Sequence, residues 1–108
     1  MDTRPPAGLA GVQHPNGTGG PMFLVTLDYT DPARIDELLE AHYTNPDGAF
    51  ERGLVRLAGR LEPRTGGLMI LDGTRQEVDA AVAADPFVRH GAAKATVVEF
   101  HPTRGAFA

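Results

Sequence analysis

The chain has 108 residues, which is room for one small domain. Apolar residues make up 42% of it and the formal net charge is -4, so neither a fully disordered chain nor a basic nucleic-acid-binding protein is expected. It contains no cysteine and no serine, which excludes disulfides, thiolate ligands and serine nucleophiles. No apolar run approaches the ~20 residues that span a bilayer, and no signal peptide is recognisable, so we expect a cytoplasmic protein without a membrane partner.

Residues 1–21 differ in composition from the rest of the chain. They hold five glycines and four prolines, and their few apolar residues show no period. Such a segment cannot bury enough apolar surface to offset the entropy lost on ordering it. We therefore predict a flexible leader over 1–21, a folded domain over 22–102 and a short tail over 103–108. His14 lies in the leader and is not counted as a candidate.

The first half of the domain predicts a strand followed by a helix. Residues 22–29 are rich in β-branched and aromatic side chains, as strands are. Asp31-Pro32 is a typical helix start, with a capping carboxylate before a proline. One helical face then carries Ile35, Leu38, Leu39 and His42. The turn signal at 45–48 breaks this helix, residues 49–52 can resume it, and Gly53 can end it.

The second half predicts two strands, a helix and a last strand. The two strands cover 54–61 and 67–71, with a turn at 63–66 between them. A capping box, Thr74 to Glu77, starts the helix, and its apolar stripe is Val78, Ala81 and Val82. Asp85-Pro86 ends this helix because proline disfavours helical geometry in the residue before it. The last strand covers 93–101.

The element order β-α-β-β-α-β is that of the ferredoxin-like α+β fold, an antiparallel sheet with both helices on one face. A monomer would then have a polar second face. The strands are instead apolar on both sides, since Leu24 opposes Val25, and Leu68 and Ile70 oppose Met69 and Leu71. We therefore expect a homodimer whose sheets pack face to face.

His42 and Asp85 are the leading candidates for chemistry. His42 lies on the apolar helical stripe, and an imidazole can exchange protons near neutral pH. Asp85 ends the second helix, where a carboxylate can orient an imidazole. Because both helices lie on one face of the sheet, the two residues can approach each other. The alternatives are a buried histidine bonded to a backbone carbonyl and an ordinary turn aspartate.

The turn at 63–67 is a weaker candidate. Arg64, Thr65 and the backbone amides beside them could bind an anionic or oxygen-rich ligand, although a plain hairpin turn is the alternative. It lacks the lysine and glycine spacing of a phosphate-binding loop. His90 and His101 are isolated and the acidic residues are scattered, so no metal site is expected.

Several motifs in order resemble the YciI-like (YCII-related) family of small ferredoxin-like proteins. The resemblance extends from Met22 to Pro102. The matching landmarks are Ala41-His42, Gly53, Gly59, Pro63-Arg64-Thr65-Gly66-Gly67, Asp85-Pro86-Phe87-Val88, Gly91 and Val97-Val98-Glu99-Phe100. The chain departs from the family at Ala58-Gly59-Arg60, where many relatives read Ser-Gly-Pro, and at the helix interruption over 43–48.

The resemblance implies a dimer with a histidine–aspartate pair in a pocket, which maps onto His42 and Asp85. One relative is a dehydrochlorinase of a chlorinated hydroxyhydroquinone, in which such a dyad is thought to act in acid–base elimination. We therefore expect a small lyase- or isomerase-like enzyme without a cofactor, acting on a small hydroxylated ring. Arg60, Arg64, Thr65 and Gly59 are its expected substrate-binding residues.

Two other functions remain open from the sequence. The dimer pocket could bind a metabolite or support a partner enzyme while the dyad is vestigial. The chain could instead be a structural interaction protein with a buried, silent His42.

Overall fold

The structure, a computed structural model, describes residues 20–108. Most of the predicted leader, and His14 with it, therefore lies outside the described residues. The elements in chain order are β1 (Met22–Tyr29), α1 (Pro32–Thr44), β2 (Val55–Arg60), β3 (Gly66–Leu71), α2 (Arg75–Ala84), α3 (Pro86–Arg89) and β4 (Ala93–Phe100).

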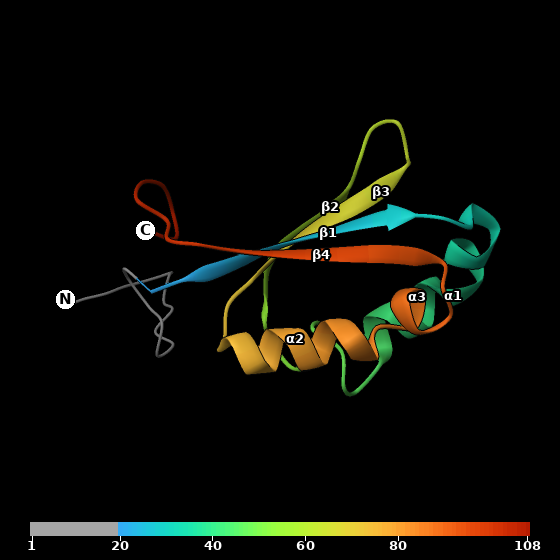
Figure 1. The fold of residues 1–108 in the computed structure, drawn as a ribbon, viewed down its shortest axis with the longest axis horizontal. Coiled ribbons are helices and arrows are strands. Elements are labelled where there is room, and N and C mark those ends of the chain that lie inside the picture. Colours follow the sequence, from blue (N-terminus) through green and yellow to red (C-terminus); the bar gives the residue numbers. More distant parts are fainter. Residues whose placement is uncertain (1–19) are drawn as a thin grey trace.

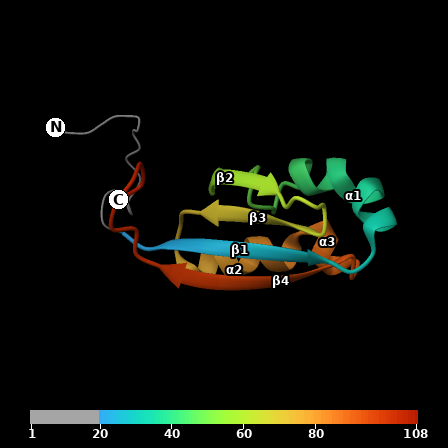
Figure 2. The same ribbon diagram turned by 90° about the horizontal axis from the view of Figure 1, so that it is seen from above.

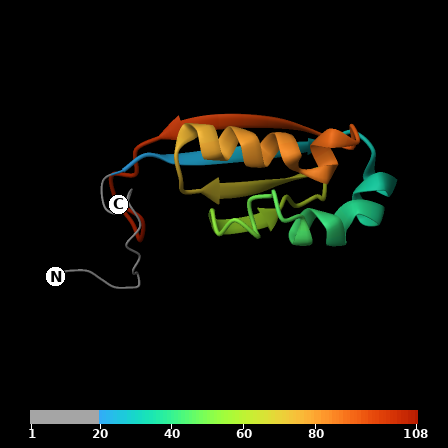
Figure 3. The ribbon, with the colours of Figure 1, turned by 90° about the horizontal axis from the view of Figure 1, so that it is seen from below.

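The four strands form one antiparallel sheet in the order β2-β3-β1-β4. The helices lie on one side of this sheet (Figure 1). Seen from above, the strands lie in front of α2 and α3 (Figure 2), and seen from below, α2 runs across the sheet while α1 lies beyond the end of β2 (Figure 3). This arrangement confirms the expected ferredoxin-like α+β fold.

The predicted resumption of the first helix over 49–52 is wrong. Asp31 caps α1 as expected, since its carboxylate accepts from the Arg34 backbone N–H, but the helix ends at Thr44. The chain then makes hydrogen-bonded turns, and Gly53 leaves them with a φ of 74°. The segment between the turn and Gly53 is too short to propagate a helix, because helix nucleation is costly.

The prediction that the second helix ends at Asp85 is confirmed for α2, but it misses the single turn of α3. Pro86 takes the first position of α3, where its missing N–H costs nothing. The turn ends at Gly91, whose φ of 70° lets the Ala92 N–H donate to the Phe87 carbonyl at 2.8 Å. These two ends hold Phe87 within the single turn of α3, between α2 and β4.

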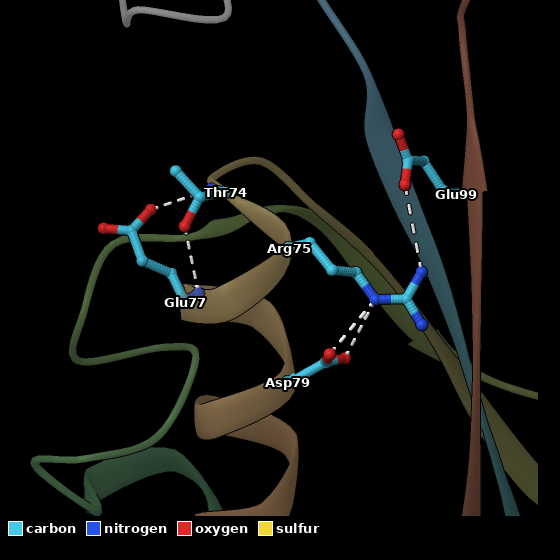
Figure 4. Close-up of polar contacts among 5 residues, drawn as sticks. All are labelled: Thr74, Arg75, Glu77, Asp79 and Glu99. Carbon is cyan, nitrogen blue, oxygen red and sulfur yellow. Dashed lines mark hydrogen bonds and ion pairs between the residues drawn. The ribbon is translucent and has the colours of Figure 1, made fainter.

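The predicted capping box of α2 is confirmed (Figure 4). Thr74 Oγ1 accepts from the Glu77 N–H at 3.0 Å, and Glu77 Oε1 accepts from the Thr74 N–H at 2.8 Å. In the next turn Arg75 Nε donates to Asp79 at 3.1 Å, and Arg75 Nη1 lies 3.9 Å from Glu99 of β4. The Arg75 guanidinium also lies 5.9 Å from the Phe23 ring centroid, so it joins α2 to the sheet.

We expect Thr74→Ala to lower the free energy of unfolding by about 1 kcal/mol, because it removes the hydroxyl that satisfies the Glu77 N–H. Urea unfolding measures the change. Gln76→Ala is the matched control, since Gln76 is exposed in the same helical turn. Equal effects of the two substitutions would contradict a stabilising role for the cap.

The core lies between the helices and the inner face of the sheet. It is formed by side chains that alternate along the strands, with those of the helices: Phe23, Val25, Leu27, Met69, Leu71, Ile35, Val78 and Phe87 are all buried. The opposite face carries Leu24, Ile70 and Val98, which are neighbours in the strand register, together with Leu57 and Leu68. We call these five residues the open apolar face. Leu57 is 60% exposed and Val98 48% exposed.

Candidate functional site

The structure brings His42 and Asp85 together, as the sequence predicts. His42 Nδ1 lies 2.7 Å from Asp85 Oδ2, and the two residues are only 7% and 6% exposed. The distance is that of an ion pair, although the ring N–H is not aligned as in a good hydrogen bond. Catalytic contacts of this kind often become fully aligned only when a ligand binds.

Asp85 is fixed by its place between two helices. It is the C-cap of α2 and the N-cap of α3. Its Oδ1 accepts from the Phe87 N–H at 2.8 Å, which leaves Oδ2 for His42. One carboxylate oxygen therefore binds the backbone and the other contacts the imidazole. Together these two contacts fix the orientation of the Asp85 and His42 side chains.

The His42 ring is packed among aromatic rings. It stacks on Phe87 with ring centroids 4.1 Å apart and planes at 9°. Tyr43 and Phe50 meet it edge-on, with centroids 5.1 and 5.2 Å away. Nε2, the nitrogen that does not face Asp85, makes no hydrogen bond within residues 20–108, so it is available to a ligand.

A cavity of about 420 Å³ opens beside this ring. That volume suits a small organic molecule. The cavity lies between α1 and the β2–β3 hairpin, and its walls are mostly apolar and aromatic. The residues that line it are Leu27, Tyr29, Leu39, His42, Tyr43, Phe50, Ala58, Gly59, Arg60, Arg64, Gly67, Leu68, Met69 and Phe87.

Most of the predicted ligand-binding residues line this cavity, but they do not all reach it. Gly59, Arg60 and Arg64 belong to its lining. Asp85 lies behind His42, on the side away from the cavity. Thr65 is not part of the lining, and its hydroxyl is turned toward the Pro63 carbonyl at 3.4 Å. Thr65 therefore has no contact with the cavity in this structure.

Arg64 is held over the cavity by two groups. Its Nη2 donates to Asp36 Oδ1 of α1 at 2.7 Å, and its guanidinium lies 5.9 Å from the Tyr29 ring centroid. The hydrogen bond that Arg64 donates to Asp36, and then the negative charge of Asp36, raise the pKa of Arg64. Arg60 has no acidic partner in the part of the chain that the structure describes.

The helix interruption after Thr44 changes the cavity wall without opening it. Asn45 caps α1, and its Nδ2 donates to the Ala84 carbonyl at 2.7 Å, which fastens the end of α1 to the end of α2. The chain then returns Phe50 to the His42 ring. Sequence reasoning missed Phe50 as a wall residue, because only the tertiary turn, not any local period, places it there.

The sequence pattern did indicate two other residues of the cavity wall, Tyr29 and Phe87. Tyr29 follows Leu27 on the inner face of β1, so strand alternation points it toward the helices. Phe87 stands two residues after the candidate Asp85. His90 and His101 are exposed and lie outside the cavity lining. Residues 20–108 contain no group of three or more His, Cys, Asp or Glu side chains placed to hold a metal ion.

Comparison with known proteins identifies the family. The model of the YCII-related domain matches residues 22–101. The chain belongs to the YCII-related family. No curated protein and no solved structure gives a significant match to it. Within the described range, none of the helices has the length and apolar character to cross a membrane.

Proposed function

We propose that this YCII-related protein is a small acid–base enzyme that needs no cofactor and acts on a small hydroxylated ring. The observation that carries the proposal is the contact between His42 and Asp85 beside a ligand-sized cavity. Asp85 keeps the proton on Nδ1 and balances the charge of an imidazolium, so that Nε2 faces the bound molecule as a base. The same nitrogen returns the proton as an acid.

The surrounding rings support a flat ligand. Tyr43, Phe50 and Phe87 fix the plane of the imidazole, and the cavity continues past them to Leu27 and Met69. Aromatic walls favour offset or edge-on contacts with another ring. A molecule with one or two fused aromatic rings, and with a hydroxyl group near Nε2, fits these walls.

For a halogenated hydroxylated ring the steps balance without an oxidant or reductant. The His42 imidazolium delivers a proton to the ring carbon that carries the halogen, which makes this carbon tetrahedral. Nε2 then takes a proton from one ring hydroxyl while the halide leaves with its bonding electron pair, and a second ring hydroxyl gives its proton to solvent, so that a neutral quinone forms. The net change is the loss of one hydrogen halide, and His42 ends in its starting state. A positioned acid–base group contributes about 10²–10⁴-fold to such a step.

The test is chloride release from a chlorinated hydroxyhydroquinone under anaerobic conditions, followed with a chloride electrode. We expect catalysed release with the wild-type protein and only the background rate with His42→Asn. Binding of the compound, seen as a higher melting temperature without chloride release, would instead support a non-catalytic ligand-binding or accessory protein with a vestigial dyad. Release that is independent of His42 would contradict the proposed mechanism.

We further propose that the protein acts as a cytoplasmic homodimer joined through the open apolar face. Its support is the exposure of Leu57 and Val98 beside Leu68, on the side of the sheet opposite the helices. Exposed apolar patches of this kind mark interaction sites, and a two-fold related copy presents the same patch.

We expect the wild-type protein to have the mass of a dimer at micromolar concentration, and Leu57→Lys to have that of a monomer, because the new charge would be buried unpaired. Light scattering after size-exclusion chromatography gives both masses. Gln76→Lys adds the same charge on the exposed side of α2 and should leave the dimer intact. A monomeric wild-type protein would refute the proposed interface.

A further inference from the structure

Two arginines line the cavity, and they differ in whether a carboxylate pairs with them. Arg60, at the end of β2, and Arg64, in the turn before β3, both line it. Arg64 is bonded to Asp36 at 2.7 Å and lies against the Tyr29 ring. Its positive charge is therefore already balanced by a carboxylate, and its donors are partly used.

Arg60 has no such carboxylate partner within residues 20–108. It lies on the same face of β2 as Ala58, pairs in register with Gly67, and extends on the inner side of the sheet toward the cavity. No hydrogen bond or ion pair of its guanidinium is found within residues 20–108. An arginine without an acidic partner keeps its full charge and its donors for a ligand.

The cavity lining includes no carboxylate, so the Arg60 charge is not offset from within. Since Asp36 offsets Arg64 and Asp85 is paired with His42, the Arg60 guanidinium is the cation of this cavity that no carboxylate of residues 20–108 balances. We propose that it selects planar ligands with a single negative charge, that Arg60 binds the anionic group, and that Asp36 determines this specificity by neutralising Arg64. This inference rests on the proposed function, because it assigns a substrate class to the same cavity.

Three probes of similar shape test the proposal: benzoate with one negative charge, isophthalate with two, and neutral benzamide. Dissociation constants are measured by NMR titration of the wild-type protein. We expect benzoate to bind more tightly than the other two. Arg60→Gln should weaken benzoate binding about 10- to 100-fold, the usual effect of losing a charge-assisted hydrogen bond. Arg64→Gln should change it much less.

Asp36→Asn is the decisive variant, because it frees Arg64 while replacing an exposed side chain by one of the same shape. It should raise isophthalate affinity about 10-fold relative to benzoate. An unchanged ratio, an Arg60→Gln protein that still binds benzoate normally, or a wild-type protein that does not bind benzoate would overturn the inference. His42-dependent chloride release would still stand in those cases. Conversely, if the three probes bind with the expected order of affinities but no chloride is released, the charge selectivity stands and the proposed enzymatic activity is refuted.

Discussion

Asp85→Asn is expected to lower kcat/KM for chloride release about 10²–10⁴-fold while the protein stays folded. An asparagine can keep the cap of α3, because its side-chain oxygen still accepts from the Phe87 N–H. Its amide nitrogen then faces His42 Nδ1 in place of Oδ2. Two donors cannot face each other, so the imidazole changes tautomer and places its proton on Nε2, where the base is needed.

His42→Asn completes this test. The asparagine amide can occupy the place of Nδ1 and still donate to Asp85, but nothing replaces Nε2. We expect the same loss of kcat/KM with a melting temperature close to that of Asp85→Asn. If both variants kept the wild-type kcat/KM, the pair would be a structural contact only. A loss of activity that follows a loss of far-UV circular dichroism would be misfolding and would not count in favour of the dyad.

Gly66→Ala is expected to have the largest effect on stability, a loss of about 3 kcal/mol or more in the free energy of unfolding. A Cβ at this position would overlap the Leu27 carbonyl oxygen, which is backbone and cannot turn away. Gly66 pairs with Asp28 of β1, and its carbonyl accepts from the Leu61 N–H at 2.8 Å. The substitution therefore separates β3 from β1 at the turn end of the β2–β3 hairpin.

Gly59→Ala is the matched control, since a Cβ at Gly59 meets open space. Its stability should stay within about 0.5 kcal/mol of wild type. Gly66→Ala should also weaken benzoate binding, because the hairpin that it displaces carries both Arg60 and Arg64. Urea unfolding of the two variants side by side gives the comparison, and equal stabilities would contradict the close approach of β3 to β1.

The elements that follow local rules could be read from the sequence. The alternation in β1, the capping aspartate of α1 and the capping box of α2 each depend on neighbours within a few residues, and the structure has each of them. The fold follows from their order. What failed was also local in origin: the segment 49–52 contains helix-forming residues, but it lies between Gly48 and Gly53 and is too short to nucleate a helix.

The site could be predicted in part. His42 and Asp85 were found because one lies on an apolar stripe and the other precedes a proline, and the fold then brings the two helix ends together. The Asp36–Arg64 pair and the return of Phe50 to the imidazole could not be predicted. The first joins α1 to a turn 28 residues further along the chain, and the second depends on the irregular turns that follow α1, so no local period indicates either contact.

Deuterium incorporation shows whether His42 moves protons on a ring bound in the cavity. Hydroxyhydroquinone is incubated anaerobically in D₂O with wild-type protein or with His42→Asn, and proton NMR follows the loss of ring C–H signals. Because Nε2 of wild-type His42 can deliver a deuteron to a ring carbon and remove a proton from it, we expect exchange well above the background rate with the wild-type protein and only the background rate with His42→Asn. Equal exchange rates with the two proteins would contradict this role of His42.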